Sequence, residues 1–352
     1  MVMALSVQDK LRSKLVKKFG DGSVSVASDR KALAHIPYGI SPKSLALDLL
    51  IGRPGFPAGR LTEICALEHR GKSTLGYQVL SQCQKQGGIG VLIETENAFE
   101  ASRLETLGVS TDDLVLLQPT YIEEALDMIL QTMISLRVDS KFEGPLAIIL
   151  DTIARTPSSA EFEGNFDQQQ MAHAARVISL GLRKLVRPLG MYKAVLIFMN
   201  QLTHTMQRYG DAYDSYGGQS IKSTASLRIL IEFLKKDLEY AEGKKSGELV
   251  GARIKAYTMK NKLSLPFQTT RYYLDFHKGI DQIDDLWTAS LTIGVLKPSK
   301  GSFSFTIGKS QAMISRDKWG DFILDKFRST DKLRERLTTT ALEKGLLKPY
   351  GQ

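Results

Sequence analysis

The residues with the clearest chemical potential form one short run, Gly71-Lys72-Ser73-Thr74, which follows an apolar stretch and opens a helical one. Gly71 lets the backbone curl so that amide N–H groups converge on phosphate oxygens at a helix N-terminus. Lys72 supplies positive charge for the β- and γ-phosphates, and the Ser73 hydroxyl is a ligand for Mg²⁺. The predicted nucleotide-binding loop comprises Glu68, His69, Arg70, Gly71, Lys72, Ser73 and Thr74.

Further polar side chains follow other apolar runs. Asp151 ends one of them, and a carboxylate there holds Mg²⁺ through its water shell. Glu94 and Glu96 follow a second run, where a glutamate can polarise a water molecule for attack on the γ-phosphate. Residue type alone leaves both glutamates open, and Glu96 is favoured because Glu94 lies closer to the strand. Gln201 follows a third run and can hydrogen-bond a γ-phosphate.

These side chains need a scaffold that brings the ends of several strands together. The expected strands are Leu61–Ala66, Gly90–Glu94, Leu146–Asp151, Ala194–Met199, Arg228–Phe233, Arg253–Met259 and Thr270–Leu274. A helix is expected from Lys72, and helical patterns also cover Ile122–Leu136 and Gln168–Leu185. This alternation predicts an α/β fold with a mostly parallel sheet covered on both faces. Ligands of such sheets bind at the carboxyl ends of the strands, where the candidate residues lie.

The two ends of the chain differ from this centre. Asp9–Phe19 is predicted to be an amphipathic helix, either a solvated helix or a docking arm. From Gln282 a small, basic, mostly helical piece is expected, with helices at Trp319–Phe327 and Lys332–Lys344. The predicted organisation is an N-terminal arm (1–36), a core (37–281) and a C-terminal domain (282–352).

Composition narrows the class of protein. The chain has 352 residues, a net charge of +9 and a pI near 9.3, which favour a polyanionic partner. The excess of positive charge lies at the two ends of the chain. Residues 1–60 and 295–352 each have a net charge of +6, and residues 61–294 have a net charge of −3. Two cysteines exclude a disulfide framework, and the five histidines lack metal-ligand spacing. No apolar run has membrane-spanning length, so a cytoplasmic protein is expected.

A long polar segment after Gln201 provides candidate contacts to nucleic acid. The segment 204–216 contains Met206, Arg208 and three tyrosines. Long loops inside compact domains are usually functional or mobile, and aromatic side chains on them can stack on bases. A surface loop without a ligand is the alternative interpretation.

In this order and spacing, the motifs resemble the bacterial RecA recombinase family, including its phage-encoded members. The resemblance covers nearly the whole chain. Its further marks are Lys17-Lys18-Phe19-Gly20-Asp21-Gly22-Ser23, Ser44-Leu45-Ala46-Leu47-Asp48, Pro57-Ala58-Gly59-Arg60, Gln118-Pro119, Glu161-Phe162-Glu163-Gly164, Gly217-Gly218, Lys260-Asn261-Lys262 and Pro266-Phe267. The resemblance implies a RecA-type phosphate-loop ATPase core, an N-terminal helical polymerisation arm and a small α/β C-terminal domain.

It also implies roles around ATP and Mg²⁺. Lys72 and Ser73 would bind the phosphates, and Asp151 would lie on the metal side. Glu96 would position the hydrolytic water, and Gln201 would sense the γ-phosphate. Lys260 and Lys262 would reach the ATP of a neighbouring subunit and complete its site. Arg103 stands where the family has a tyrosine stacked on adenine.

For DNA, the resemblance implies two loops, 156–171 and 203–219, in a helical homo-oligomeric filament on single-stranded DNA. The candidate contacts are Met171, Arg176, Arg183, Met206, Arg208, Gly217, Gly218 and Gln219. Independently of the resemblance, the net charge of +6 in residues 295–352 leads to the hypothesis that the C-terminal domain gathers incoming double-stranded DNA. The implied activity is DNA-dependent ATP hydrolysis coupled to homologous pairing and strand exchange in recombination and repair.

Two departures from the family keep alternatives open. Ala66 replaces a glycine of the phosphate loop, and Ser223 replaces an aromatic residue at the subunit interface. Both allow a DNA-binding scaffold that hydrolyses ATP weakly. A ring-forming helicase motor shares the nucleotide core but does not need Lys260, Lys262 or the paired loops.

Overall fold

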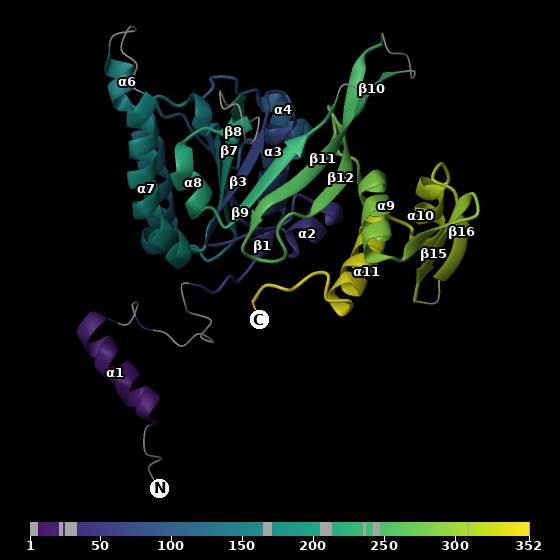
Figure 1. Ribbon diagram of the computed structural model, residues 1–352, viewed down its shortest axis with the longest axis horizontal. Coiled ribbons are helices and arrows are strands. Elements are labelled where there is room, and N and C mark those ends of the chain that lie inside the picture. Colours follow the sequence, from purple (N-terminus) through teal and green to yellow (C-terminus); the bar gives the residue numbers. More distant parts are fainter. Residues whose placement is uncertain are drawn as a thin grey trace.

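The computed structural model describes residues 6–20, 24, 34–164, 171–204, 213–234, 237–241, 247–308 and 310–351. A large sheet runs through the main body, with helices on both of its faces (Figure 1). Its strands, in spatial order, are β13 (Gly279–Ile280), β12 (Thr269–Asp275), β11 (Leu249–Asn261), β9 (Leu227–Glu232), β3 (Arg60–Ala66), β7 (Val195–His204), β6 (Leu146–Asp151), β4 (Ile89–Glu94) and β5 (Leu114–Leu117).

Six of these strands, from β9 to β5, are parallel to one another, and β11, β12 and β13 continue the sheet in antiparallel order. β10 (Leu238–Tyr240) pairs with β11, and β8 (Tyr213–Ser215) pairs with β7. The architecture confirms the predicted α/β fold with a mostly parallel sheet. β5 was not predicted, because an edge strand of four residues, none of them fully buried, has too short a pattern to recognise.

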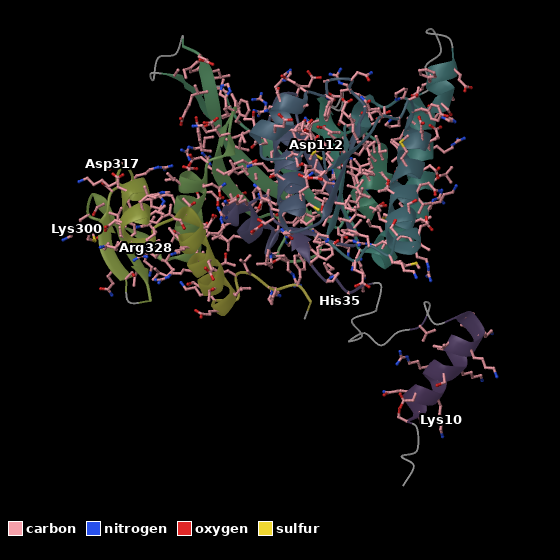
Figure 2. All side chains as sticks on the ribbon, turned by 180° about the vertical axis from the view of Figure 1, so that it is seen from behind. Lys10, His35, Asp112, Lys300, Asp317 and Arg328 are labelled. Carbon is pink, nitrogen blue, oxygen red and sulfur yellow. The ribbon has the colours of Figure 1, made fainter. Side chains whose placement is uncertain are left out.

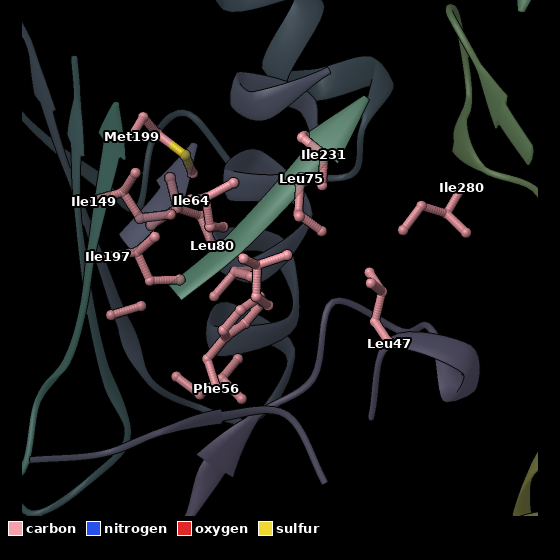
Figure 3. Close-up of a cluster of buried hydrophobic side chains, with 14 of the residues drawn as sticks. Leu47, Phe56, Ile64, Leu75, Leu80, Ile149, Ile197, Met199, Ile231 and Ile280 are labelled. Carbon is pink, nitrogen blue, oxygen red and sulfur yellow. The ribbon is translucent and has the colours of Figure 1, made fainter. Parts of the chain in front are cut away.

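The sheet separates two apolar cores, and consecutive residues of one strand face different cores. Ile149 of β6 packs with Val79 and Leu80 of α3 (Lys72–Lys85), in the cluster drawn in Figure 3. Its neighbour Ile148 packs on the other face, with residues of α5 (Ile122–Ile134) and α7 (Met171–Tyr192). A strand buried on both faces reads as an unbroken apolar run, which explains why β6 was recognisable in the sequence.

The other helices of the main body are short. They are α2 (Leu45–Ile51), α4 (Ala101–Thr106), α6 (Ser159–Glu163) and α8 (Gly218–Thr224). α5 ends earlier than predicted and continues as a π-helical turn (Ser135–Asp139), whereas α7 extends past the expected Leu185 and contains Pro188. No helix in the described part of the chain is long and apolar enough to cross a membrane.

The C-terminal region contains a small sheet as well as helices. It consists of α9 (Gln282–Ile293), β14 (Leu296–Ser299), β15 (Ser302–Ile307), β16 (Ser310–Ile314), α10 (Trp319–Phe327) and α11 (Thr330–Glu343). The three strands are antiparallel, which confirms the small α/β domain that the resemblance implies. The two expected helices are present as α10 and α11, whereas the sheet is absent from the elements expected from periodicity. Phe303, Phe305 and Ile307 alternate with polar residues along β15, which is the period-2 pattern of a strand with one buried face.

The C-terminal region shares a core and a buried carboxylate with the main body. Leu45 of α2 belongs to the same apolar cluster as Trp287, Phe305 and Trp319. Asp285 of α9 accepts hydrogen bonds from the Leu45 and Ala46 amides, at 2.8 and 3.2 Å, at the N-terminus of α2. Removing the region would therefore expose part of this shared core.

The N-terminal helix α1 (Val7–Phe19) lies apart from the main body (Figure 1). Ser6 and Asp9 form a reciprocal capping box at its start, which stabilises its first turn. None of its residues is buried, and Val7, Leu11 and Phe19 are exposed. α1 therefore presents apolar side chains that the described residues of its own chain do not cover.

Candidate nucleotide-binding site

The phosphate loop connects the end of β3 at Ala66 to the start of α3 at Lys72. Two residues of the loop have left-handed backbone, His69 with φ of 55° and Gly71 with φ of 85°. At Gly71 an added Cβ atom would also meet Leu274 Cδ2, the far end of a flexible side chain, so it is chiefly the backbone conformation that favours glycine here. The curl that results turns the chain into the N-terminus of α3, where backbone amides are free to bind anions.

Ala66, which replaces a glycine of the family motif, is accommodated by the strand. It is the last residue of β3 and pairs with Gln201 of β7. An extended strand backbone is open to any residue with a side chain, so the methyl group needs no left-handed φ here. The loop turns at His69 and Gly71, which have left-handed backbone, and the replacement at Ala66 does not affect this turn.

Lys72 is buried against its own loop. Its Nζ donates hydrogen bonds to the Leu67 carbonyl at 3.0 Å and to the Ala66 carbonyl at 3.4 Å. Burial lowers the pKa of the ammonium group, while the nearby carboxylates of Asp151 and Glu96 act to raise it. A buried ammonium whose hydrogen-bond partners are carbonyl oxygens is well suited to bind phosphate oxygens instead.

Asp151 ends β6 beside Glu94, its partner at the end of β4. Burial raises the pKa of Asp151 to about 6, and a hydrogen bond with the Ser73 side chain acts in the opposite direction. The carboxylate is therefore increasingly ionised as the pH rises through about 6, which is the form that binds a cation. A carboxylate and a hydroxyl are oxygen ligands of the kind that Mg²⁺ prefers, so these residues fit that ion.

The two glutamates after β4 have different surroundings. Glu94 is only 4% exposed, and its Oε1 accepts hydrogen bonds from the amides of Glu96, at 2.8 Å, and Ala98, at 3.1 Å. It thus holds the turn that follows the strand. Glu96 lines the cavity in front of the phosphate loop, with 35% of its side chain exposed. Glu96 is therefore the glutamate whose carboxylate lines the cavity, whereas the carboxylate of Glu94 accepts hydrogen bonds from backbone amides.

A cavity of about 720 Å³ collects most of the predicted nucleotide site. Its lining includes Glu68, His69, Arg70, Gly71, Lys72, Ser73, Thr74, Glu96, Arg103, Asp151 and Gln201. At the side away from β6 it is lined by apolar residues such as Phe233, Leu274 and Phe276. The guanidinium of Arg103 donates to the His277 carbonyl at 3.1 Å and to Thr74 Oγ1 at 3.3 Å. The cavity therefore combines a polar end suited to phosphates with an apolar end suited to a base.

The two lysines assigned to a neighbouring subunit lie elsewhere. Lys260, near the end of β11, donates hydrogen bonds from Nζ to the carbonyls of Lys222, at 2.6 Å, and Ser223, at 2.8 Å. Burial, with the nearby charge of Lys262 as the next cause, lowers the pKa of Lys260. Neither lysine is among the described residues that line the cavity. Within one chain they do not contribute to the nucleotide site.

The candidate DNA contacts lie partly within the described residues. Arg176 and Arg183 are exposed and two turns apart on α7, and the expected first loop contains the helix α6. Gly217 and Gly218 have left-handed backbone at the start of α8, and Gln219 is exposed. Met206 and Arg208 lie outside the described residues, as does the side chain of Met171.

A buried polar network beside Gln201 was not anticipated. Asn200 Nδ2 donates to Glu63 Oε1 at 2.7 Å and to the Tyr216 carbonyl at 2.8 Å. Glu63 forms an ion pair with Arg228 of β9, which also donates to Ser215 Oγ at 3.0 Å. The sequence does contain a sign of this network, because the charged residues Glu63 and Arg228 interrupt the apolar runs of β3 and β9. The network joins β3, β7 and β9 to the segment that leads into α8.

Comparison with known proteins places the chain in a family. The family model described as the RecA N-terminal domain matches residues 7–281. Protein RecA of Chlorobaculum parvum is 32% identical over 335 residues, covering 94% of this chain and 92% of that protein. Protein RecA of Aquifex pyrophilus is 30% identical over 340 residues, with 96% and 91% covered. Protein RecA of Sulfurimonas denitrificans is 32% identical over 346 residues, with 95% and 96% covered.

Proposed function

Because the chain belongs to the RecA family of recombinases, we propose that it binds single-stranded DNA with ATP, forms helical filaments and catalyses homologous pairing and strand exchange. The single observation that carries this proposal is the cavity of about 720 Å³ in which the phosphate loop, Asp151, Glu96 and Gln201 meet. These residues come from the carboxyl ends of four parallel strands, where open α/β sheets bind their ligands.

In this proposal the cavity binds ATP with its phosphates at the loop. Loop amides and Lys72 bind the phosphate oxygens, and Ser73 and Asp151 hold Mg²⁺, which neutralises phosphate charge when bound. Glu96 orients and accepts a proton from the attacking water. Gln201 hydrogen-bonds the γ-phosphate. The half-buried Arg103 and the apolar residues at the other end of the cavity contact the base.

The buried network gives a route from nucleotide to DNA. Gln201 follows Asn200 directly, and Asn200 is bonded to Glu63 and to the Tyr216 carbonyl just before Gly217. In this proposal a displacement of Gln201 by the γ-phosphate reaches the start of α8 through these hydrogen bonds of Asn200. We assign to this route the ATP dependence of DNA binding by Gly217, Gly218 and Gln219. Arg176, Arg183 and Met171, with Met206 and Arg208, complete the proposed contacts to single-stranded DNA.

Filament formation would use parts of the chain that have no role in the nucleotide site of their own subunit. The exposed apolar side chains of α1 would pack on the core of a neighbour, and Lys260 and Lys262 would complete the neighbour's ATP site. Such contacts join two different surfaces, so they generate an open helical assembly rather than a closed dimer. The arm (1–36), the core (37–281) and the C-terminal domain (282–352) are the corresponding functional units.

The C-terminal domain is proposed to gather double-stranded DNA with its exposed lysines. Lys297, Lys300 and Lys318 are exposed, and Lys300 lies at the outer end of the domain (Figure 2). We expect the replacement of these three lysines by glutamine to make duplex binding less sensitive to salt. The slope of log K against log salt concentration should become shallower by about one for each phosphate that the variant no longer neutralises. Binding to single-stranded DNA should persist, as measured by fluorescence anisotropy in a salt series. Equal losses for both forms of DNA would contradict this division of labour.

Hydrolysis of ATP with and without single-stranded DNA separates the proposal from a weakly hydrolysing scaffold. The departures at Ala66 and Ser223 allow that second candidate, although Ala66 itself is accommodated as the last residue of β3. We expect single-stranded DNA to raise the steady-state rate of phosphate release by at least about tenfold, because the assembled filament adds trans cations to the site. A rate that is equally low with and without DNA would favour the scaffold.

A further inference from the structure

Arg155 places a guanidinium in the nucleotide cavity that the sequence motifs do not account for. It is the last residue of a 3-10 turn (Ile153–Arg155) that follows β6 directly. Its Nη2 is 2.5 Å from Glu68 Oε1 in the phosphate loop, and its Nε is 3.7 Å from Glu96 Oε1 after β4. All three residues line the cavity. One side chain therefore bridges two walls of the proposed ATP site.

The backbone of this turn is fixed, whereas the arginine side chain is free to change partners. The Thr152 amide donates to Thr95 Oγ1 at 3.0 Å, and the hydroxyl of Thr156 donates back to the Thr152 carbonyl at 2.9 Å. Ile153 between them is fully buried. The Arg155 side chain is 52% exposed, and ion pairs at such exposure stabilise a fold little. Its guanidinium can thus leave both carboxylates without disturbing the fold.

The other cations of the cavity have different partners. Arg70, Lys72 and Arg103 each donate hydrogen bonds to backbone carbonyls, and Arg103 also donates to a threonine hydroxyl. Among the lysine and arginine side chains that line the described part of the cavity, Arg155 is the one paired with carboxylates. A terminal phosphate carries more negative charge than either carboxylate, and a guanidinium binds it through two parallel hydrogen bonds.

We propose that Arg155 binds the terminal phosphate of ATP within its own subunit, exchanging Glu68 and Glu96 for the phosphate. The inference rests on the proposed function, because it assumes that the γ-phosphate lies on the wall formed by Glu96 and Gln201. ADP has no phosphate at this position, so Arg155 stays on the two glutamates. Arg155 is then a specificity-determining residue that favours ATP over ADP, and its departure frees Glu96 to hold water only when the γ-phosphate is present.

Nucleotide affinities in the absence of DNA test this assignment. The non-hydrolysable ATP analogue AMP-PNP and ADP, each with Mg²⁺, would compete against a fluorescent ADP analogue for the full-length chain. For Arg155→Ala we expect AMP-PNP to bind about tenfold more weakly and ADP to change by less than about twofold. Arg155→Lys should give an intermediate ratio, since it keeps the charge but loses the bidentate geometry. Arg271→Ala, an exposed arginine of β12 outside the cavity lining, is the matched control and should behave as wild type.

The ratio of the affinities for AMP-PNP and ADP decides the outcome, because a general loss of folding lowers the affinity for both nucleotides. Equal weakening of AMP-PNP and ADP, or no change in either, would overturn the assignment. If Arg155→Ala fails to fold, Arg155→Lys decides: a lowered preference for AMP-PNP supports the assignment, and an unchanged ratio refutes it. Wild-type protein that binds neither nucleotide would refute the proposed function itself, whereas normal wild-type binding with an unchanged variant ratio refutes only the role of Arg155.

Discussion

Replacing Glu96 by glutamine is expected to lower the rate of DNA-stimulated ATP hydrolysis by about 10²- to 10⁴-fold, the usual contribution of a general base. Glutamine keeps the size of the side chain and can hydrogen-bond water, but it cannot accept the proton. Because Glu96 is at the cavity rim and Glu94 holds the turn, the change should leave the phosphate loop intact. AMP-PNP-dependent binding of single-stranded DNA should therefore persist while phosphate release is lost.

Glu100→Gln is the matched control for this variant. Glu100 is exposed at the start of α4, four residues beyond Glu96, and does not line the cavity. Its ATP hydrolysis should equal that of wild type. Near-normal turnover in Glu96→Gln would exclude Glu96 as the base. Loss of DNA binding together with turnover would instead indicate that the carboxylate is needed for the fold of the site.

The double replacement of Lys260 and Lys262 by alanine is expected to reduce DNA-stimulated turnover by about 10³-fold, the effect of a cation supplied in trans to a phosphoryl-transfer site. Neither lysine lines the cavity of its own chain, so nucleotide binding by isolated subunits should change little. Lys260 also donates to two carbonyls at the end of α8, so the thermal midpoint of the variant must be compared with wild type. Lys255→Ala on the same strand is the control.

Mixing two inactive variants tests whether the site is shared between subunits. Lys72→Ala lacks the loop lysine but retains Lys260 and Lys262, and the double variant retains the loop. In a random equimolar filament with a heterologous interface, about a quarter of the interfaces combine an intact loop with intact trans lysines. Turnover should recover to about that fraction of wild type. A mixture as inactive as its components would contradict the shared site.

The sequence predicted the fold and most of the cavity for one physical reason. Parallel strands buried on both faces read as apolar runs, and their polar last residues mark the edge where ligands bind. Asp151 and Gln201 could be placed in this way, and the curl at Gly71 followed from its residue type. Glu96 was favoured over Glu94 because Glu94 lies closer to the strand, and the hydrogen bonds of Glu94 to the backbone of the turn add a reason that only the structure provides.

What the sequence did not predict depends on contacts between distant segments. Arg155 follows a strand in a position that looks like an ordinary polar turn, and only the folded chain places it against Glu68 and Glu96. The Glu63–Arg228 pair joins residues 165 positions apart, and no local pattern links them. The strands of the C-terminal sheet are short, and the period-2 alternation along β15 spans only six residues. Local periodicity in the sequence therefore predicts helices and strands, but the buried polar contacts between strands become visible only once the strands are paired in the sheet.

Electron microscopy of the wild-type protein with single-stranded DNA, Mg²⁺ and AMP-PNP shows directly whether the chain forms ATP-dependent helical filaments on DNA. We expect continuous helical filaments on the DNA, and we expect them to be absent when ADP replaces AMP-PNP. Closed rings, or particles that remain single on DNA in the presence of AMP-PNP, would contradict this expectation.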